Sequence, residues 1–454
     1  MKYLFLIIAM LKSSLINHRK EQEVLTPSIM VLSPHSVHGC IIVALLSIMT
    51  ISARAQVQSP IINDDSSVTF SILAPEADEV YLRGDFIPNG IPIETPLGAV
   101  RKAGKREMKQ DSNGVWTYTT EPLKSDFYSY YYEVDEVKTI DSVNPLIVHD
   151  GEEQFSYFVI PGDIADNYLV NNVPHGKVST VRYQSSLPDA PQRYMTIYTP
   201  PQYKTEPKHN FPVLYLLHGS SSDEHSWTDV GRAAQILDNL IAKGHCVPMI
   251  VVMPDVLLDG NLQSMVGHIE KAFIPDIVNY VEKHYRLLPS KQGRAIAGVS
   301  MGGLHSIFIT ANNPEAFDYV GLFSPQTSTS MMDDKSRQGS KALAQKIDAV
   351  TDALPFLKKM GIGKKASDFA DAINDGELEI YENLDEKLKS QFKNPPRLYY
   401  IAMGREDFLK KTNDEFMARL TGAGYKYIYN ETEGGHDWRQ WRQYLLDFLP
   451  RLFK

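Results

Sequence analysis

A short stretch around Ser300 constrains the fold of this 454-residue chain more than any other. An apolar run at residues 295–297 leads into Gly298-Val299-Ser300-Met301-Gly302, and an apolar helical pattern follows. Gly-x-Ser-x-Gly between a strand and a helix is the sequence form of a nucleophile elbow, a sharp turn that holds a serine in a strained conformation. Both glycines have a physical reason, since Cβ atoms would clash where the strand and helix backbones approach each other.

The segments around this elbow alternate between apolar strands and helices. Alternation of this kind predicts a mostly parallel sheet with helices on both faces. Together with the elbow it predicts an α/β-hydrolase domain, placed at residues 196–454. The expected strands are 193–199, 211–217, 247–253, 319–323, 398–403 and 425–430, and the expected helices are 229–243, 273–284 and 438–453.

Residues 56–167 carry a different pattern, with short strands separated by turns. The strands are rich in β-branched and aromatic residues, and Asn113-Gly114 is a turn signal. This pattern predicts a small all-β sandwich ahead of the α/β domain. The clearest strand segments are 68–73, 79–84, 115–119 and 127–134.

Two further segments complete the predicted organisation. Residues 168–195 contain several prolines and few apolar runs, so they are expected to form a linker with one or two strands, such as 177–183. Residues 326–390 are polar and fall between two expected strands, where shorter connections are typical. They are interpreted either as a lid over the active site or as a surface insertion.

The first 55 residues have the pattern of an N-terminal extension and a signal peptide. The apolar run at 40–51 is short for a membrane span, which takes about 20 residues. It is followed by Ala53-Arg54-Ala55, an A-x-A-like cleavage site. The sequence therefore predicts export to the periplasm or outside the cell, with cleavage near Ala55 and no stable membrane insertion; a retained anchor is the alternative. Initiation at Met30 would give a signal of normal length.

Charge and cysteine content exclude several classes of partner. The formal net charge is −9 and no long basic run is present, so a nucleic-acid partner is not expected. If Cys40 leaves with the signal, Cys246 remains alone and no intrachain disulfide forms. Cys246 precedes an apolar run and is interpreted as a buried structural thiol. No His/Cys cluster has ligand spacing, so neither a metal nor a cofactor is implied.

A serine nucleophile needs a general base, and the base needs a group that orients it. In α/β-hydrolases the acid and then the histidine follow the serine along the chain. His436 is the best base, because it lies on a glycine-rich loop between an expected strand and an expected helix. His305 falls on the elbow helix and is interpreted as a packing or surface residue.

Asp407 is the best candidate for the acid, because it follows the expected strand 398–403. Glu406 is its rival and Asp414 a weaker one. The acid would hold the imidazole in one tautomer and stabilise the imidazolium ion. Phe408 is expected to pack inward and fix this loop.

The oxyanion that forms during attack needs preorganised N–H donors. One is expected from the amide of Met301, directly after the nucleophile. The second is expected from the amide of Ser220, in the loop that begins with His218-Gly219. An ordinary polar loop at residues 220–222 is the alternative.

Five motifs follow one another between residues 190 and 454. They are Leu216-Leu217-His218-Gly219, Val251-Val252-Met253-Pro254-Asp255, Gly298-Val299-Ser300-Met301-Gly302-Gly303, Gly404-Arg405-Glu406-Asp407 and Gly434-Gly435-His436-Asp437-Trp438-Arg439-Gln440-Trp441-Arg442. Together they resemble carbohydrate esterase family 1, which includes feruloyl and acetylxylan esterases; related esterase-D-like enzymes include enterochelin esterases. The resemblance implies a triad of Ser300, Asp407 and His436 and an oxyanion hole of Ser220 and Met301. Trp227 and Trp438 accompany these motifs as candidate substrate-pocket residues.

The motifs of the predicted sandwich include Gly84-Asp85-Phe86 and Asn113-Gly114-Val115-Trp116. With them, the sandwich resembles the early-set immunoglobulin-like domain related to family-48 carbohydrate-binding modules. Trp116 and the tyrosines are expected to fill the sandwich core or its interface, and stacking on sugar rings is the alternative. The two resemblances together imply a secreted serine esterase that acts on feruloyl or acetyl esters of xylan-type polysaccharide through an acyl-enzyme. The alternatives are a siderophore esterase, a sugar acyltransferase and a non-catalytic carbohydrate-binding protein.

Overall fold

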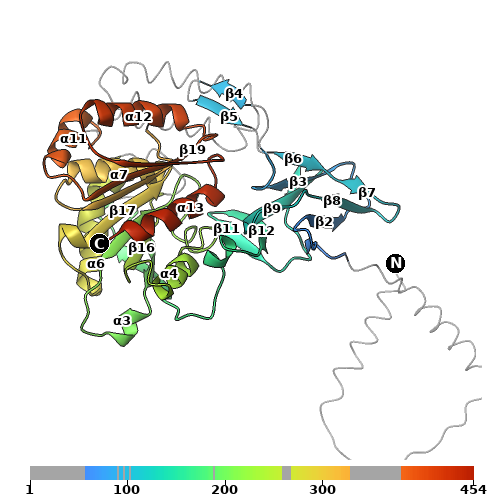
Figure 1. Ribbon diagram of the computed structural model, residues 1–454, viewed down its shortest axis with the longest axis horizontal. Coiled ribbons are helices and arrows are strands. Elements are labelled where there is room, and N and C mark those ends of the chain that lie inside the picture. Colours follow the sequence, from blue (N-terminus) through green and yellow to red (C-terminus); the bar gives the residue numbers. More distant parts are fainter. Residues whose placement is uncertain are drawn as a thin grey trace, which may run out of the picture. The chain divides into compact units, whose positions relative to one another are not determined.

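The computed structural model of the chain describes residues 57–88, 92–95, 98–101, 104–187, 190–257, 267–327 and 380–454. Val57–Lys454 form one compact unit (Figure 1). The predicted signal segment with Cys40 and Ala55 lies outside the described residues, and so does most of the predicted insertion at 326–390. Within the described residues, every helix falls short of the length and apolar character that a membrane crossing requires.

The centre of the unit is an eight-stranded sheet with the order β13-β14-β16-β15-β17-β18-β19-β20. The strands from β16 to β20 are parallel to one another, whereas β13 and β14 are antiparallel to their neighbours. The mostly parallel sheet is thus confirmed. The strands are β13 (Lys177–Gln184), β14 (Gln192–Thr199), β15 (Val213–Leu217), β16 (Ile250–Pro254), β17 (Arg294–Val299), β18 (Tyr319–Phe323), β19 (Leu398–Gly404) and β20 (Ile428–Thr432).

The inner strands are buried along their whole length because helices cover both faces of the sheet. Every residue of β15, β16, β18 and β19 is buried, as expected for parallel strands enclosed on two sides. One face packs against α4 (Ala233–Ala242) and α13 (Trp438–Phe448). The other packs against α5 (His268–Ala272), the π-helix η3 (Phe273–Val278), α6 (Asn279–His284), α7 (Met301–Asn312), α11 (Leu384–Lys393) and α12 (Lys410–Gly422).

The register of the parallel strands brings their carboxyl ends to one edge of the sheet. Leu217 is opposite Gly298, and Val299 is opposite Phe323. Ligands of open α/β sheets bind outside this edge. The loops after β15, β17, β19 and β20 therefore define the place where a site is expected. Short helices elsewhere are η1 (Ala165–Asn167), α3 (Gln202–Thr205), η4 (Lys291–Gly293) and η7 (Leu449–Arg451).

Ahead of this sheet, the chain forms antiparallel sheets. A four-stranded sheet has the order β1-β2-β8-β7, a six-stranded sheet has the order β11-β12-β9-β3-β6 with β10 paired to β9, and β4 pairs with β5. The strands are β1 (Ile61–Ile62), β2 (Val68–Leu73), β3 (Val80–Gly84), β4 (Pro92–Thr95), β5 (Gly98–Arg101), β6 (Lys105–Glu107), β7 (Lys109–Gln110), β8 (Val115–Thr119), β9 (Asp126–Val134), β10 (Val137–Thr139), β11 (Ile147–Asp150) and β12 (Glu153–Ile160). We call this region the front sheets; its assignment to the immunoglobulin-like family stays a prediction.

Aromatic side chains fill the space inside the front sheets. Trp116 is 8% exposed and its Nε1 donates to the carbonyl oxygen of Ala74 at 2.9 Å. Tyr130 and Tyr132 are fully buried, and both hydroxyls donate to Asp141. These rings fill the core, as expected, and their faces are closed to a sugar.

The strand expected at 177–183, within the predicted linker 168–195, is present as β13. Strand β13 lies within that linker and β14 begins in it, and the two are the first strands of the large sheet. The large sheet therefore begins before residue 196. The prediction missed β13 as part of this sheet because most of its residues are exposed or partly exposed, as in an edge strand, so no apolar run marks it.

The outer face of the six-stranded sheet packs against α4 and α13, the helices that cover one face of the large sheet. Phe127 of β9 and Val148 of β11 belong to the same buried cluster as residues of α4 and α13. Arg442 of α13 is fully buried and donates to the carbonyl oxygens of Phe127 at 2.7 Å and Val230 at 3.0 Å. The front sheets and the large sheet therefore share a core.

Candidate active site

Ser300 occupies the sharp turn between β17 and α7. Its backbone has φ +51° and ψ −114°, a conformation that costs a non-glycine residue of order 1–3 kcal/mol. Two backbone hydrogen bonds hold the turn: the Ser300 amide donates to Phe323 at 3.0 Å, and the Gln326 amide donates to Ser300 at 2.9 Å. A Cβ on Gly298 would lie 2.3 Å from the backbone of Gly302, so the predicted reason for glycine here is confirmed.

His436 follows β20 and precedes α13, and its ring contacts a buried carboxylate. Nδ1 of His436 lies 2.9 Å from Oδ2 of Asp407. The Asp407 side chain is fully buried and its Oδ1 also accepts a hydrogen bond from the amide of Leu409 at 2.9 Å. A carboxylate held in this way keeps the proton on Nδ1 and leaves Nε2 as the basic nitrogen.

The structure separates Asp407 from its two rivals. Glu406 and Asp414 are exposed, and Asp414 pairs with Lys410 one helical turn away. The Glu406 amide donates to the carbonyl oxygen of Gly434 at 2.9 Å, which ties the acid loop to the histidine loop through the backbone. Among the three carboxylates, it is Asp407 that the structure brings to His436.

Two aromatic rings bracket the imidazole of His436. The Phe408 ring centroid lies 4.6 Å from the imidazole centroid, in line with the inward packing expected of Phe408. The Trp441 ring meets the imidazole edge-on at 5.0 Å. Sequence reasoning gave Trp441 no role. The signal that marked it is its place in the motif at residues 434–442, five residues after His436.

Ser300 follows β17 and His436 follows β20, so both lie at the carboxyl edge of the sheet, but no hydrogen bond joins them in the described structure. Catalytic hydrogen bonds are often long in unliganded enzymes and tighten when substrate binds. The loop after β15 also reaches the serine, because a Cβ on Gly219 would lie 3.3 Å from the Ser300 Cβ. Ser220 and Met301, the predicted oxyanion donors, directly follow Gly219 and Ser300.

His218 shapes the loop that carries Ser220. The ring is buried, its Nδ1 lies 2.8 Å from the carbonyl oxygen of Gly219, and its Nε2 accepts from the Val256 amide at 2.9 Å. Nε2 also lies 3.5 Å from Oδ1 of Asp255, the residue that follows β16. The ring therefore ties the loops after β15 and β16 together.

Trp227 and Trp438, the candidate substrate-pocket residues, lie in the core beneath the loops. Trp227 is fully buried and its Nε1 donates to the carbonyl oxygen of Leu217 at 3.1 Å. Trp438 is 8% exposed, packs edge-on to Trp227 at 5.1 Å, and donates from Nε1 to Asp150 at 2.7 Å. Both indoles are committed to the core beneath the loops and leave almost no surface for a substrate.

His305 is a packing residue inside the elbow helix. It is fully buried, and its Nδ1 lies 2.7 Å from Oε1 of the buried Glu270. The Tyr381 hydroxyl donates to the same oxygen at 2.6 Å, and burial followed by the Glu270 charge holds the pKa of Tyr381 well above its usual value. This cluster joins α7 to α5 and to the chain before α11.

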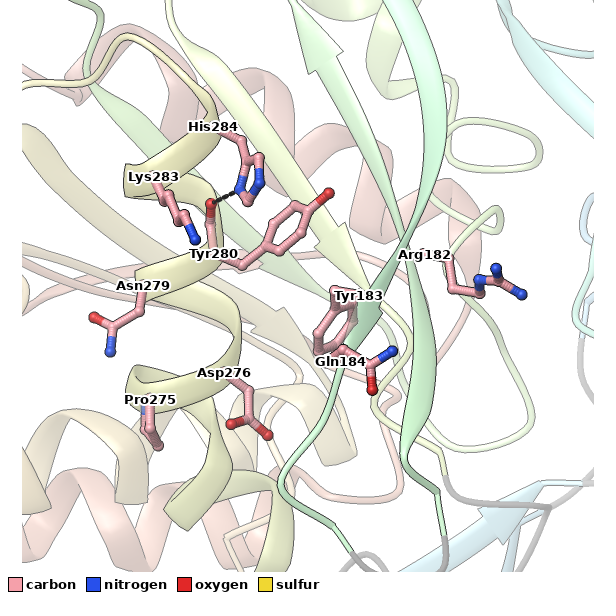
Figure 2. A pocket seen from close by; sticks show the side chains of 9 residues that line it. All are labelled: Arg182, Tyr183, Gln184, Pro275, Asp276, Asn279, Tyr280, Lys283 and His284. Atoms are coloured by element: carbon pink, nitrogen blue, oxygen red, sulfur yellow. Dashed lines mark hydrogen bonds between the residues drawn. The ribbon is translucent and has the colours of Figure 1, made fainter.

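A cavity of about 520 Å³ lies away from these loops, between β13 and the helices η3 and α6 (Figure 2). Two of the polar side chains that line it have partners within the protein. Oδ2 of Asp276 accepts from the Ser186 amide at 2.6 Å, and Nδ1 of His284 lies 2.7 Å from the carbonyl oxygen of Tyr280. In the part of the chain that the structure describes, no group of three or more His, Cys, Asp or Glu could hold a metal ion.

Comparison with curated proteins finds relatives that match this chain over only part of their own length. An endo-1,4-beta-xylanase/feruloyl esterase of Xylanibacter ruminicola is 31% identical over 59% of this chain and 36% of its own length. An esterase of Mycobacterium tuberculosis is 27% identical over 54% of this chain and 52% of its own length. The chain thus spans about a third to a half of these two relatives.

Solved structures include the enterobactin esterase FES of Shigella flexneri, with a TM-score of 0.54 and 16% identity. The likeness covers 85% of this chain and 93% of that one, and it is a likeness of fold. The covered share exceeds what residues 190–454 make up, so the likeness includes part of the region ahead of residue 190. Residues 190–452 match the model of the family described as "Esterase: Putative esterase". This match covers more than half of the chain, which therefore belongs to that esterase family.

Proposed function

We propose that the chain hydrolyses carboxylic esters with Ser300 as nucleophile, His436 as general base and Asp407 as the orienting acid. The observation that carries this proposal is the 2.9 Å contact between Asp407 and His436, at the same carboxyl edge of the sheet as the strained elbow that presents Ser300. Membership of the esterase family supports the same chemistry.

In the proposed reaction, the Ser300 Oγ attacks the ester carbonyl while Nε2 of His436 takes the hydroxyl proton. Asp407 stabilises the imidazolium ion through Nδ1. The imidazolium then gives its proton to the departing alcohol oxygen, and an acyl-enzyme on Ser300 remains. Water, activated by the same imidazole, attacks the acyl-enzyme and releases the acid.

The proposed oxyanion hole consists of the amides of Met301 and Ser220. Met301 is the first residue of α7, so its amide lies among the unpaired N–H groups at a helix N-terminus. The approach of Gly219, whose added Cβ would lie 3.3 Å from the Ser300 Cβ, supports a donor from the loop that carries Ser220. Both amides would stabilise the charge that develops on the carbonyl oxygen.

The proposed substrates are feruloyl or acetyl esters of xylan-type glycans, met after export outside the cytoplasm. The relative named endo-1,4-beta-xylanase/feruloyl esterase supports this choice. The fold likeness to an enterobactin esterase supports siderophore esters as the second candidate. A carbohydrate-binding role for the front sheets, as an early-set immunoglobulin-like module, belongs to the same proposal.

A substrate panel with matched variants tests the function. Purified protein is assayed on methyl ferulate, acetylated xylan and a catecholate trilactone, with Ser300→Ala as the inactive partner. We expect release of ferulate or acetate, and a loss of several orders of magnitude in Ser300→Ala with the thermal unfolding profile unchanged. Hydrolysis of the trilactone alone would replace the polysaccharide substrate, and substantial activity in Ser300→Ala would refute the nucleophile.

A further inference from the structure

The hairpin between β11 and β12 reaches from the front sheets to both candidate catalytic loops. Oδ1 of Asp150, at its tip, accepts a hydrogen bond from the Ser222 hydroxyl at 2.5 Å. Oδ2 accepts from Nε1 of Trp438 at 2.7 Å. Ser222 is two residues after Ser220, and Trp438 is two residues after His436. One carboxylate therefore joins the oxyanion loop, residues 219–222, to the loop that carries the candidate base.

The backbone of the same hairpin lies directly against the oxyanion loop. Gly151 has φ +58°, and a Cβ on it would lie 2.2 Å from the carbonyl oxygen of Ser221. Its amide donates to the Ser226 hydroxyl at 3.2 Å. Ser221 is itself in the left-handed region with φ +71°. The loop thus holds an uncommon conformation at the residue against which the hairpin packs.

The groups that bind Asp150 are buried and lead on to the imidazole. Ser222 is 5% exposed and Trp438 8% exposed, so neither bond competes freely with water. The Trp438 ring packs against Trp441 at 5.0 Å, and Trp441 packs against His436 at the same distance. Burial raises the pKa of Asp150, whereas the bonds from Ser222 and Trp438 favour its ionised form. The two hydrogen bonds therefore offset part of the cost of burying the Asp150 carboxylate.

We propose that Asp150 is a positioning residue of the esterase, which holds the oxyanion loop and the histidine loop in register with each other. This inference rests on the proposed function. Asp150 touches no reacting atom; it acts through Ser222 on one loop and through Trp438 on the other. The front sheets thereby become part of the machinery that aligns Ser220 and His436 around Ser300.

The first test compares two variants of Asp150, one that removes both hydrogen bonds and one that removes only the charge. Asp150→Ala removes both bonds, and we expect kcat on an activated aryl ester to fall by about 10- to 100-fold, since misplacement of about 1 Å costs this much. KM is expected to change by less than about three-fold, because a small ester gains little binding energy from these loops. In Asp150→Asn the amide oxygen accepts from Trp438 and the amide nitrogen donates to Ser222, so we expect most of kcat to return.

His149→Ala is the matched control. His149 is the neighbouring residue on β11, and its ring Nδ1 lies 3.0 Å from Oδ2 of Asp229, a residue outside the oxyanion loop 219–222 and outside the histidine loop. This variant loosens the same interface, and we expect kcat to stay at the wild-type level. Equal losses in His149→Ala and Asp150→Ala would overturn the proposal, and so would wild-type kcat in Asp150→Ala or an Asp150→Asn variant as impaired as Asp150→Ala.

Ser222→Ala keeps the proposal testable if Asp150→Ala does not fold. It removes only the bond to the oxyanion loop, and we expect kcat to fall by about 10-fold. Wild-type kcat in folded Ser222→Ala would contradict the bridge. The measurement is a comparison of kcat and KM with the thermal unfolding midpoint for each variant.

A readout that does not depend on catalysis separates this proposal from the proposed function. In the Ser300→Ala background, amide hydrogen exchange is followed in peptides covering 219–226 and 434–440. We expect Asp150→Ala to speed exchange in both peptides and His149→Ala to leave both unchanged. Faster exchange in neither peptide would sink the positioning role. Failure of the esterase assay, in contrast, would leave this exchange result standing and reject only the proposed function.

Discussion

Gly404 and Gly434 lie so close together that a Cβ on Gly404 would be 2.3 Å from the Gly434 carbonyl oxygen. This contact presses the acid loop after β19 onto the histidine loop after β20. The Glu406 amide bonds to the same carbonyl oxygen at 2.9 Å. Backbone packing between the two loops therefore brings the side chains of Asp407 and His436 together.

Asp407→Asn is expected to lower kcat by about 10⁴-fold with little change in KM, because an amide can present its NH₂ to Nδ1 and stabilise the wrong tautomer. Steady-state kinetics on an aryl ester measure this effect. Glu406→Gln is the matched control, since the neighbouring carboxylate is exposed, and we expect it to keep wild-type kcat. Comparable losses in the two variants would show that the acid was assigned to the wrong residue.

Gly302→Ala is expected to destabilise the protein and to impair the site. Its Cβ would lie 2.4 Å from the carbonyl oxygen of His218, a backbone atom that cannot move alone. Overpacking of this kind typically costs about 1–3 kcal/mol of unfolding free energy, and the shift would be passed to the loop that carries Ser220. Chemical denaturation and kcat measure the two effects.

Gly422→Ala serves as the control for this glycine prediction. Gly422 ends α12, and a Cβ there would meet no atom within 4 Å. Alanine is the better helix former, so we expect stability to stay the same or to rise by up to about 1 kcal/mol. A stable, active Gly302→Ala variant would contradict the close approach at the elbow.

Asp85 is expected to make the stability of the folded chain depend on pH. Burial raises the pKa of Asp85 from 3.8 to about 7, although the Ser129 amide and hydroxyl both donate to it. Between these two values the folded chain binds a proton that the unfolded chain has lost, so the free energy of unfolding falls as pH rises across this range. Urea unfolding at intervals from pH 4 to pH 8 should show this slope, and Asp85→Asn should flatten it. Identical slopes in the two proteins would reject the assignment.

Cys246 is expected to be unreactive in the folded protein. It is 5% exposed, and burial raises the pKa of its thiol to about 12, so the reactive thiolate is scarce at neutral pH. Mass spectrometry after iodoacetamide treatment should find the Cys246 peptide unmodified in native protein and modified in urea. Rapid native labelling would show that this part of the core opens.

The elbow and the two loop residues could be predicted because local chemistry and chain order determine them. The five residues from Gly298 to Gly302 are enough to predict that glycine is required at both ends for steric reasons. Asp407 and His436 follow two successive strands of a parallel sheet, whose carboxyl ends meet at one edge, so their contact follows from the topology.

The support beneath the loops could not be predicted in the same way. Asp150 and Trp438 are 288 positions apart, and neither carries a local pattern that points to the other. Trp227 and Trp438 were expected in a substrate pocket because aromatic rings suit both binding sites and cores. Only the packing of the front sheets against α13 decides in favour of the core.

The contact of Gly151 with the Ser221 carbonyl has a consequence for protein engineering and for evolution by domain exchange. Residues 190–452 match a family model by themselves, which suggests a catalytic module that could be transplanted. The candidate oxyanion loop of this module, however, contacts Gly151 and is hydrogen-bonded to Asp150, and both residues lie outside that range. A chimera that replaces the region ahead of residue 190 would need an equivalent hairpin tip, with a residue as small as glycine beside an acceptor for two donors.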